Sequence, residues 1–316
     1  MEIENEPYPQ AHVLKGLRRL RFNAPEESLP EVRDSVYRWW WEFLRLSKDY
    51  WMVCQTSEPH QYQVSTIDDQ LARVYRKFGY IHSVSFDEWW IDRGYSVFEE
   101  QLKFPKVTEV ERDGRERSRH RYFKDHVWID IPLKLSRRTI QRQIGKILDQ
   151  YEEQRLRNRL ELSTSQFKIN PVQYRLETLK RIHQVHTLHR ELIAKPKALQ
   201  QRGDESGYQL RADLFRIGKL LRVSPSNEHL RGDPQEIFKH QNRMRASVSR
   251  YRARANLLIA NAEQGSFPNF SPIAQSDRRR FNSKQLERHR ELENEWWKLD
   301  LSSELSQAKI EDAKRI

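Results

Sequence analysis

The sequence predicts a mainly α-helical protein with a small β-hairpin or ribbon. Apolar residues recur at three- and four-residue steps along most of the chain, and only residues 105–132 alternate around a tight-turn pair, Asp113-Gly114. The hydrophobic fraction of 37% is low and the charged fraction of 32% is high, which is typical of helix-rich proteins with much solvated surface. We therefore expect a multi-helical protein whose middle region is winged-helix-like or a ribbon-helix unit.

Residues 1–104 are predicted to form a Trp-rich helical domain. The first 30 residues contain several prolines and are expected to be irregular, apart from a short basic turn around LKGLRRLRF, residues 14–22. An aromatic stripe at helical steps follows over residues 30–51. Aromatic residues at such spacing usually belong to a core, and the basic lining of a base-stacking surface is missing here. We expect four tryptophans to be buried: Trp39, Trp40, Trp89 and Trp90.

Two further helices are expected in this domain. One covers residues 67–78 and ends at Gly79, a residue type that readily adopts a left-handed cap. The other opens at Ser85, which has the capping-box spacing to Glu88, and is expected to close at Gly94.

Residues 105–170 are predicted to contain a β-ribbon followed by a basic helix. The second strand signal is HVWIDIPL, residues 126–133. Arginines at a period of two would share one side of a strand, and such a ribbon can lie along a groove or a phosphate backbone; a disordered basic loop is the alternative. The predicted contacts are Arg115, Arg117, Arg119 and Arg121.

The basic helix of this region is expected to begin after Ser136, a good N-cap residue. Its apolar stripe is predicted to be buried and consists of Ile140, Ile144, Ile147, Leu148 and Tyr151. Long cationic and amide side chains near its N-terminal half suit a helix that faces a groove. The predicted nucleic-acid contacts are Arg137, Arg138, Gln141, Arg142 and Lys146.

Residues 171–268 are predicted to form a helical domain that contains an Arg-rich helix. Asn170-Pro171 is expected to start a helix through residue 193, followed by a loop over residues 195–208, a short helix that stops near Ser224, and a long helix over residues 235–262. The first helix carries histidines at spacings that can bind zinc, but it offers no Cys partner. We therefore expect packed or surface histidines and no metal at His183, His186 and His189.

The long helix has an unusual charge balance. Residues 236–262 hold six Lys or Arg and one acidic residue. An ordinary solvated helix interleaves Glu with its cations to form pairs four residues apart. We expect the arginines to need an external anion and predict phosphate contacts at Arg243, Arg245, Arg250, Arg252 and Arg254.

Residues 269–316 are predicted to form a tail helix. Its end is acidic, because the last 26 residues hold seven acidic and four basic side chains, and it contains the pair Trp296 and Trp297. Such an amphipathic end can dock on the basic body or on a partner protein, and the sequence leaves both open.

The net charge of +12 is distributed unevenly. Residues 1–100 hold 12 basic and 17 acidic residues, which gives −5, so the remaining residues carry +17. This asymmetry favours an acidic partner such as nucleic acid, although a merely solvated surface is the alternative. There is no apolar run of membrane length and no signal-peptide pattern, and the single cysteine, Cys54, cannot form an internal disulfide. We expect a cytoplasmic location.

No catalytic motif was found in the sequence. It contains no phosphate-binding Gly-rich loop, no G-x-S-x-G, no H-E-x-x-H and no C-x-x-C. Acidic pairs such as Asp68-Asp69 could hold Mg²⁺ in a nuclease, but carboxylates at helix starts are stabilising in any case. We expect a protein that is not an enzyme and that uses no cofactor.

Three segments resemble a loosely defined set of uncharacterised proteins of bacterial integrative elements, plasmids and prophages: YRWWWEFLRLSKDYW, IPLKLSRRTIQRQIGKIL and SRYRARANLLIANAEQGSFP. The resemblance implies a mobile-element context with a regulatory or replication-linked role. Together with the charge pattern, it leads us to expect a non-enzymatic DNA-binding protein. The alternative is a structural subunit of a ribonucleoprotein or defence complex that binds RNA and protein partners.

Overall fold

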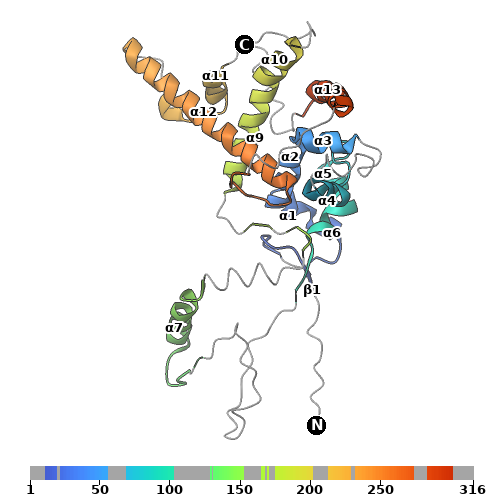
Figure 1. Ribbon diagram of the computed structural model, residues 1–316. Coiled ribbons are helices and arrows are strands. Elements are labelled where there is room, and N and C mark those ends of the chain that lie inside the picture. Colours follow the sequence, from blue (N-terminus) through green and yellow to red (C-terminus); the bar gives the residue numbers. More distant parts are fainter. Residues whose placement is uncertain are drawn as a thin grey trace.

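The fold is mainly α-helical, as predicted (Figure 1). The computed structural model describes residues 11–19, 22–55, 69–102, 129, 131–152, 165–167, 169–170, 175–201, 213–228, 232–273 and 283–301. No helix among these residues combines the length and the apolar character that crossing a bilayer requires.

The N-terminal part consists of short helices and one small sheet. The irregular start expected for the first 30 residues is wrong in part, because β1 (Ala11–Val13) pairs antiparallel with β2 (Glu100–Leu102) and the first helix already begins at Pro25, whose fixed backbone suits a first helical turn. The helices are α1 (Pro25–Val32), α2 (Val36–Arg45), α3 (Lys48–Cys54), α4 (Asp69–Phe78), α5 (Phe86–Trp89) and α6 (Tyr95–Phe98).

The predicted burial of the tryptophans is confirmed. Trp40 and Trp90 are fully buried, Trp89 is 2% exposed and Trp39 is 6% exposed. Two indole N–H groups find partners, since Trp89 Nε1 donates to the Phe78 carbonyl and Trp90 Nε1 donates to Ser28 Oγ, both at 2.8 Å. These rings build the centre of the core.

The helix ends predicted for this region are confirmed at two sites and wrong at a third. Gly79 ends α4 with φ +69°, and the capping box between Ser85 and Glu88 is formed. Gly94 does not close a helix: its φ is −56°, and the chain continues through a π-helical turn (Trp90–Gly94) into α6. A Cβ at Gly94 would lie 2.7 Å from the Trp90 ring, so this glycine permits close packing.

The predicted ribbon of residues 105–132 lies almost wholly outside the described residues, including the Asp113-Gly114 turn. The second strand expected around Val127 is not seen at Ile129 or at residues 131–133, which are irregular. Ile131 and Leu133 are 40% and 92% exposed, so the described residues do not bury these side chains. The helix after them is α7 (Arg137–Asp149), which Figure 1 shows away from the other helices.

The second half of the fold is built on two long helices. The first is α9 (Leu176–His189), which continues through a π-helical turn (Arg190–Ala194) into α10 (Lys195–Gln200). The loop expected from residue 195 is therefore wrong up to Gln200. Pro196 is the second residue of α10 and directly follows the π-helical turn.

The second long helix is α12 (Pro234–Glu263), within a few residues of the prediction. It packs on α2, on α9 and on α11 (Leu214–Leu220), and a short 3-10 turn (Pro225–Asn227) lies between α11 and α12. Gly218 of α11 allows the closest approach: a Cβ there would be 2.4 Å from Met244 Cγ.

Two clusters of buried residues hold these helices together. The larger contains the tryptophan core together with Leu179 and Ile182 of α9 and residues of α12 and the tail, so described residues on both sides of the predicted boundaries at 104 and 170 share it. The smaller joins α9, α11 and α12 and includes Val185, Ile217 and Val248.

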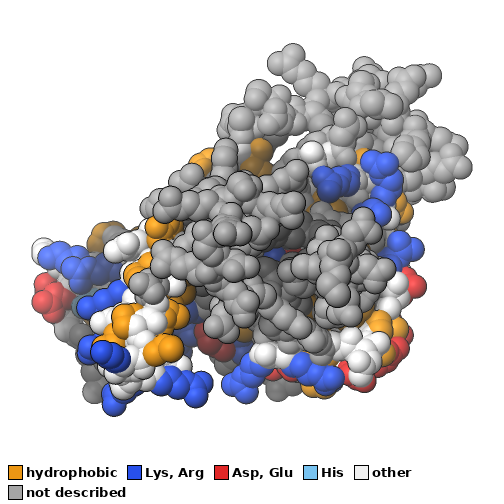
Figure 2. All heavy atoms as spheres, turned by 90° about the horizontal axis from the view of Figure 1, so that it is seen from below, with side chains coloured by type: hydrophobic (Ala, Val, Ile, Leu, Met, Phe, Trp, Pro, Cys, Tyr) orange, Lys and Arg blue, Asp and Glu red, His pale blue; other side chains and the backbone are white. Residues whose placement is uncertain are grey.

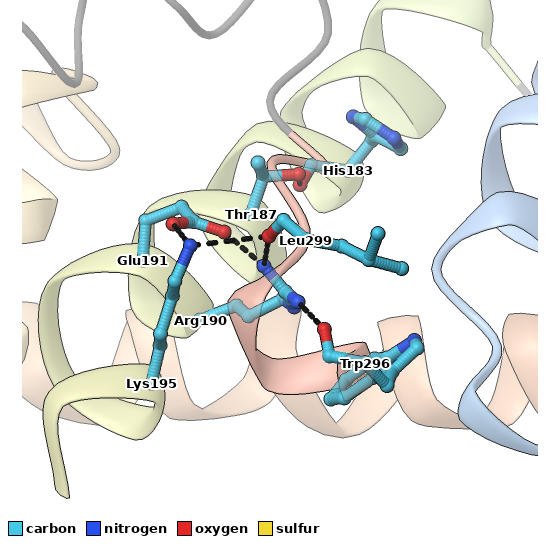
Figure 3. A network of polar contacts seen from close by, with 7 residues as sticks. All are labelled: His183, Thr187, Arg190, Glu191, Lys195, Trp296 and Leu299. Carbon is cyan, nitrogen blue, oxygen red and sulfur yellow. Dashed lines mark hydrogen bonds and ion pairs between the residues drawn. The ribbon is translucent and has the colours of Figure 1, made fainter. Parts of the chain in front are cut away.

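The tail helix α13 (Ser283–Lys298) docks on the protein's own body, against α3 and α10. Trp296 is 6% exposed and belongs to the core. The buried Arg190 donates to the carbonyl oxygens of Trp296 and Leu299 and pairs with Glu191 (Figure 3). The sequence left open whether the tail docks on the protein's own body or on a partner protein. The structure shows α13 docked on the body.

Candidate nucleic-acid interface

One flank of α12 forms a row of exposed cations, here called the basic stripe. Its members follow steps of four, seven and four residues, which at about 100° per residue confines them to about 60° of the helix circumference. At about 1.5 Å per residue the row spans about 22 Å. The basic stripe consists of Lys239, Arg243, Arg250 and Arg254.

The arginines of the basic stripe meet neutral groups. Arg250 Nη2 donates to Ser247 Oγ at 3.1 Å, and the Arg254 guanidinium lies 5.5 Å from the centre of the Phe270 ring. Within the part of the chain that the structure describes, no carboxylate forms an ion pair with Arg243, Arg250 or Arg254. Among the described residues, no carboxylate therefore neutralises the charge of these three arginines.

Arg245, on the other flank of α12, does have an acidic partner. Its Nη2 lies 2.9 Å from Asp213 Oδ2, and the same carboxylate caps the N-terminus of α11. Burial alone would raise the pKa of Asp213, but the Arg216 backbone N–H and the Arg245 side chain together lower it. The expectation that these arginines lack a partner does not hold for Arg245.

Arg252 is half-buried where α12 meets α9. Burial lowers the pKa of its guanidinium. Burial, and then the charge of nearby Arg252, lower the pKa of His189 to about 4. Arg252 thus lies beside α9, and a phosphate would reach it less easily than the basic stripe.

α7 presents its cations to solvent. The Ser136 cap is confirmed, because its Oγ accepts a hydrogen bond from the Thr139 N–H at 3.2 Å. The predicted contact residues on this helix are all exposed: Arg137, Arg138, Gln141, Arg142 and Lys146. The predicted burial of the apolar stripe is wrong, since no residue of α7 is buried and Tyr151 beyond it is 39% exposed.

The two predicted contact helices do not form one surface. α7 is not among the elements that pack on α12, and Figure 1 shows them at separate ends of the described fold. In the view from below, Lys and Arg side chains lie beside hydrophobic ones on the left, the side on which Figure 1 places α7 (Figure 2). The ribbon arginines Arg115, Arg117, Arg119 and Arg121 lie outside the described residues.

His183 is a packed core residue, as expected. It is 1% exposed and lies between the rings of Trp39 and Phe43, with centroids 5.6 and 5.4 Å away. Its Nε2 is 3.8 Å from Glu42 Oε2, and burial lowers its pKa to about 3. Among the described residues no group of three His, Cys, Asp or Glu side chains could hold a metal ion.

Phe238, on the flank of α12 that faces away from the basic stripe, was missed by the sequence analysis. This ring is 60% exposed at the N-terminal end of α12 and adjoins Lys239. The signal was present, because residue 238 lies about 120° around the helix from Met244 and about 80° from Val248 of the buried face. An aromatic residue on the polar side of a helix marks an unusual surface position.

Comparison with protein-family models, curated proteins and solved structures gives no match.

Proposed function

We propose that this protein binds nucleic acid without acting as an enzyme, and that the basic stripe of α12 is the principal contact. The observation that carries the proposal is the row of exposed arginines without a carboxylate partner in the described part of the chain. Arginine forms bidentate contacts with phosphate, and each neutralised phosphate releases counterions. A regulatory or replication-linked protein of a mobile element that binds DNA is the preferred role, in line with the sequence resemblance.

The exposed cations of α7 are a second contact region in this proposal. Arg138, Arg142 and Lys146 lie on one side of a capped helix, and the helix is narrow enough to enter a major groove. Since α7 and α12 do not pack together, they would contact separate stretches of one nucleic acid.

The test is the salt dependence of binding, measured by fluorescence anisotropy with a labelled duplex. Each phosphate contact contributes about −0.9 to the slope of log affinity against log salt. Replacing Arg243, Arg250 and Arg254 by Ala should therefore make the slope less negative by about 2.7.

Arg245→Ala is the matched control, because this arginine lies on the same helix but is paired with Asp213. It should leave the slope almost unchanged. Equal effects of Arg245→Ala and Arg250→Ala, or an affinity that does not depend on salt, would contradict the proposed interface.

A single-stranded ligand is the second candidate, favoured by Phe238. An exposed ring of this kind can stack on an unpaired base, which contributes about 1–3 kcal/mol per base. Phe238→Ala should then lower the affinity for single-stranded DNA or RNA and leave the affinity for duplex DNA unchanged. If duplex and single-stranded ligands respond alike, the ring does not stack on a base. An RNA preference would support the ribonucleoprotein alternative.

A further inference from the structure

A second group of exposed basic side chains lies on α4, here called the α4 cations. Two of them follow the first by three and four residues, so the group covers about 100° of the helix circumference. The opposite side of α4 is fully buried in the core, through Leu71, Val74 and Phe78. Within the described part of the chain, no carboxylate forms an ion pair with any of the three. The α4 cations are Arg73, Arg76 and Lys77.

The C-terminal end of α12 lies against α4, beside the N-terminal helices (Figure 1). A Cβ on Gly265, just after α12, would lie 2.9 Å from Phe167 Cε1 and 3.6 Å from Val74 Cγ2. The Arg73 guanidinium carbon is 5.4 Å from the centre of the Phe167 ring, and its Nη2 donates to the Gln166 carbonyl at 3.2 Å. A single ring therefore separates Arg73 from the end of α12.

The chain after α12 folds back along the flank that carries the basic stripe. Asn261 lies on this flank, about 20° around the helix from Arg254, and its Nδ2 donates to the Ser271 carbonyl at 2.9 Å. The Phe270 ring lies beneath the Arg254 guanidinium. Glu263 points away, about 180° around the helix from Arg254, where its carboxylate accepts from Ser47 Oγ. The end of α12 thus places no carboxylate on the flank of the basic stripe.

The folded-back segment also pairs with the segment that carries Phe167. The Asn170 N–H donates to the Phe267 carbonyl at 2.9 Å, and Ile169 forms a parallel bridge with the same residue. Neither residues 165–170 nor residues 266–271 include an Asp or a Glu. A phosphate backbone that crosses these paired segments from the basic stripe to the α4 cations therefore meets no carboxylate of either segment.

The combined row is long and straight. α12 is one helix of 30 residues, and from Lys239 to its end at Glu263 it extends about 36 Å at about 1.5 Å per residue. This is about one turn of B-form DNA, or about 11 base pairs at about 3.4 Å each. A duplex is stiff over this length, so it can follow a straight row without changing shape. A single strand would have to be held extended along it.

We propose that the basic stripe and the α4 cations form one binding surface for a double-stranded nucleic acid of at least about 11 base pairs. The α4 cations contact phosphates about one turn away from those that meet Lys239. This inference rests on the proposed function. It adds to the interface a part of the chain whose overall charge is acidic, since residues 1–100 carry −5.

The test compares two lengths of DNA by fluorescence anisotropy at several salt concentrations. A duplex of about 20 base pairs spans both groups of cations, whereas a stem of about 8 base pairs, about 27 Å long, covers the basic stripe alone. Replacing Arg73, Arg76 and Lys77 by Ala should make the slope of log affinity against log salt less negative by about 2.7 on the longer duplex. The slope on the shorter stem should stay almost unchanged.

The matched control removes the same number of charges from the N-terminal part. Its three arginines are exposed but already paired with carboxylates, so their replacement by Ala should leave the slope on both lengths almost unchanged. A slope change equal to that of the α4 variant would show an effect of net charge alone and would overturn the inference. The control arginines are Arg19, Arg33 and Arg93, paired with Glu27, Asp87 and Asp92.

A smaller variant serves if the triple replacement on α4 fails to fold. Arg76→Ala with Lys77→Ala keeps the contacts of Arg73 with Phe167 and Gln166, and it should change the slope on the longer duplex by about 1.8. Three results overturn the inference: an equal change on both DNA lengths, an equal change on a single strand of the longer length, or no change on the longer duplex.

The inference and the proposed function fail in distinguishable ways. If the α4 substitutions change nothing while the replacement of Arg243, Arg250 and Arg254 still makes the slope less negative, the inference is wrong and the proposed function stands. If neither set of substitutions changes the slope, the proposed function is wrong and the inference fails with it.

Discussion

The Arg190 guanidinium carbon lies 4.4 Å from the centre of the Trp296 ring, and Nη2 of the same side chain donates to the Trp296 carbonyl oxygen at 2.7 Å. A second nitrogen donates to the Leu299 carbonyl at 3.2 Å, and Lys195 Nζ reaches the same oxygen at 3.1 Å (Figure 3). The last carbonyls of a helix lack partners within it, so these donors cap the end of α13. Arg190 is only 2% exposed, and Glu191 pairs with its charge.

Replacing Arg190 by Ala should release the tail helix. The change leaves carbonyl oxygens and Glu191 without their buried cation, and breaking a buried pair of this kind costs about 3–5 kcal/mol. Urea unfolding followed by tryptophan fluorescence measures the loss, and limited proteolysis should cut near α13 first. The control is Arg288→Ala, because Arg288 is 53% exposed in its pair with Glu291 and should change stability by less than about 0.5 kcal/mol. Similar losses in both variants would show that the buried contact is unimportant.

Replacing Asp213 by Asn should strengthen the salt dependence of nucleic-acid binding. Asn still caps the N-terminus of α11 but no longer neutralises Arg245. The freed guanidinium can then contact one more phosphate, which makes the slope more negative by up to about 0.9. Anisotropy titrations at several salt concentrations measure this change. It should disappear in the double variant with Arg245→Ala; if it persists there, Arg245 is not its source.

Stability should fall as the pH is lowered because of His183. Burial holds its pKa at about 3 in the folded state, against about 6.5 in an unfolded chain. The unfolded state therefore binds the extra proton between these values, and the contribution of His183 is complete above about pH 6.5 and lost as the pH falls towards 3. Between pH 7 and pH 5 the loss is about 2 kcal/mol. His183→Leu should remove this part of the pH dependence of unfolding, and an unchanged acid limb would contradict the assignment.

Two glycines should respond in opposite ways to alanine. Gly218→Ala places a Cβ 2.4 Å from Met244 Cγ in a buried contact, and overpacking of this kind costs about 1–3 kcal/mol. Gly145→Ala meets open space in the middle of α7 and should favour the helix by about 0.5–1 kcal/mol. Unfolding midpoints report the first change and helix content by circular dichroism the second. Similar effects of the two changes would show that Gly218 is not needed for the approach of α11 to α12.

The sequence predicted best those features that depend on near neighbours. The Ser136 cap, the Ser85 capping box, the stop at Gly79 and the burial of Trp40 follow from residues a few positions apart, and all are confirmed. Periodicity also located α12 within a few residues, because its apolar face is long and regular.

Features that depend on distant partners were not predictable in this way. The partner of Arg245 is an acid 32 positions away, so a search for Glu four residues along the helix does not find it. Arg190 gave no signal as a buried residue, since its partners are backbone carbonyls about 106 and 109 positions later. Gly94 was predicted to end a helix because glycine is common at helix ends. In the structure this glycine instead leaves room for the rings of Trp89 and Trp90, a role that the local sequence does not reveal. The predicted arginine contacts with nucleic acid stay a prediction.

Tyr251 packs against both the tryptophan cluster and the smaller cluster of α9, α11 and α12, at a point where α12 runs from one to the other without interruption. A substitution that destabilises either cluster therefore also affects the other through α12. We expect the two clusters to unfold together in one cooperative transition. We therefore expect the segment of α12 that carries Arg243 to stay ordered as long as both clusters remain packed.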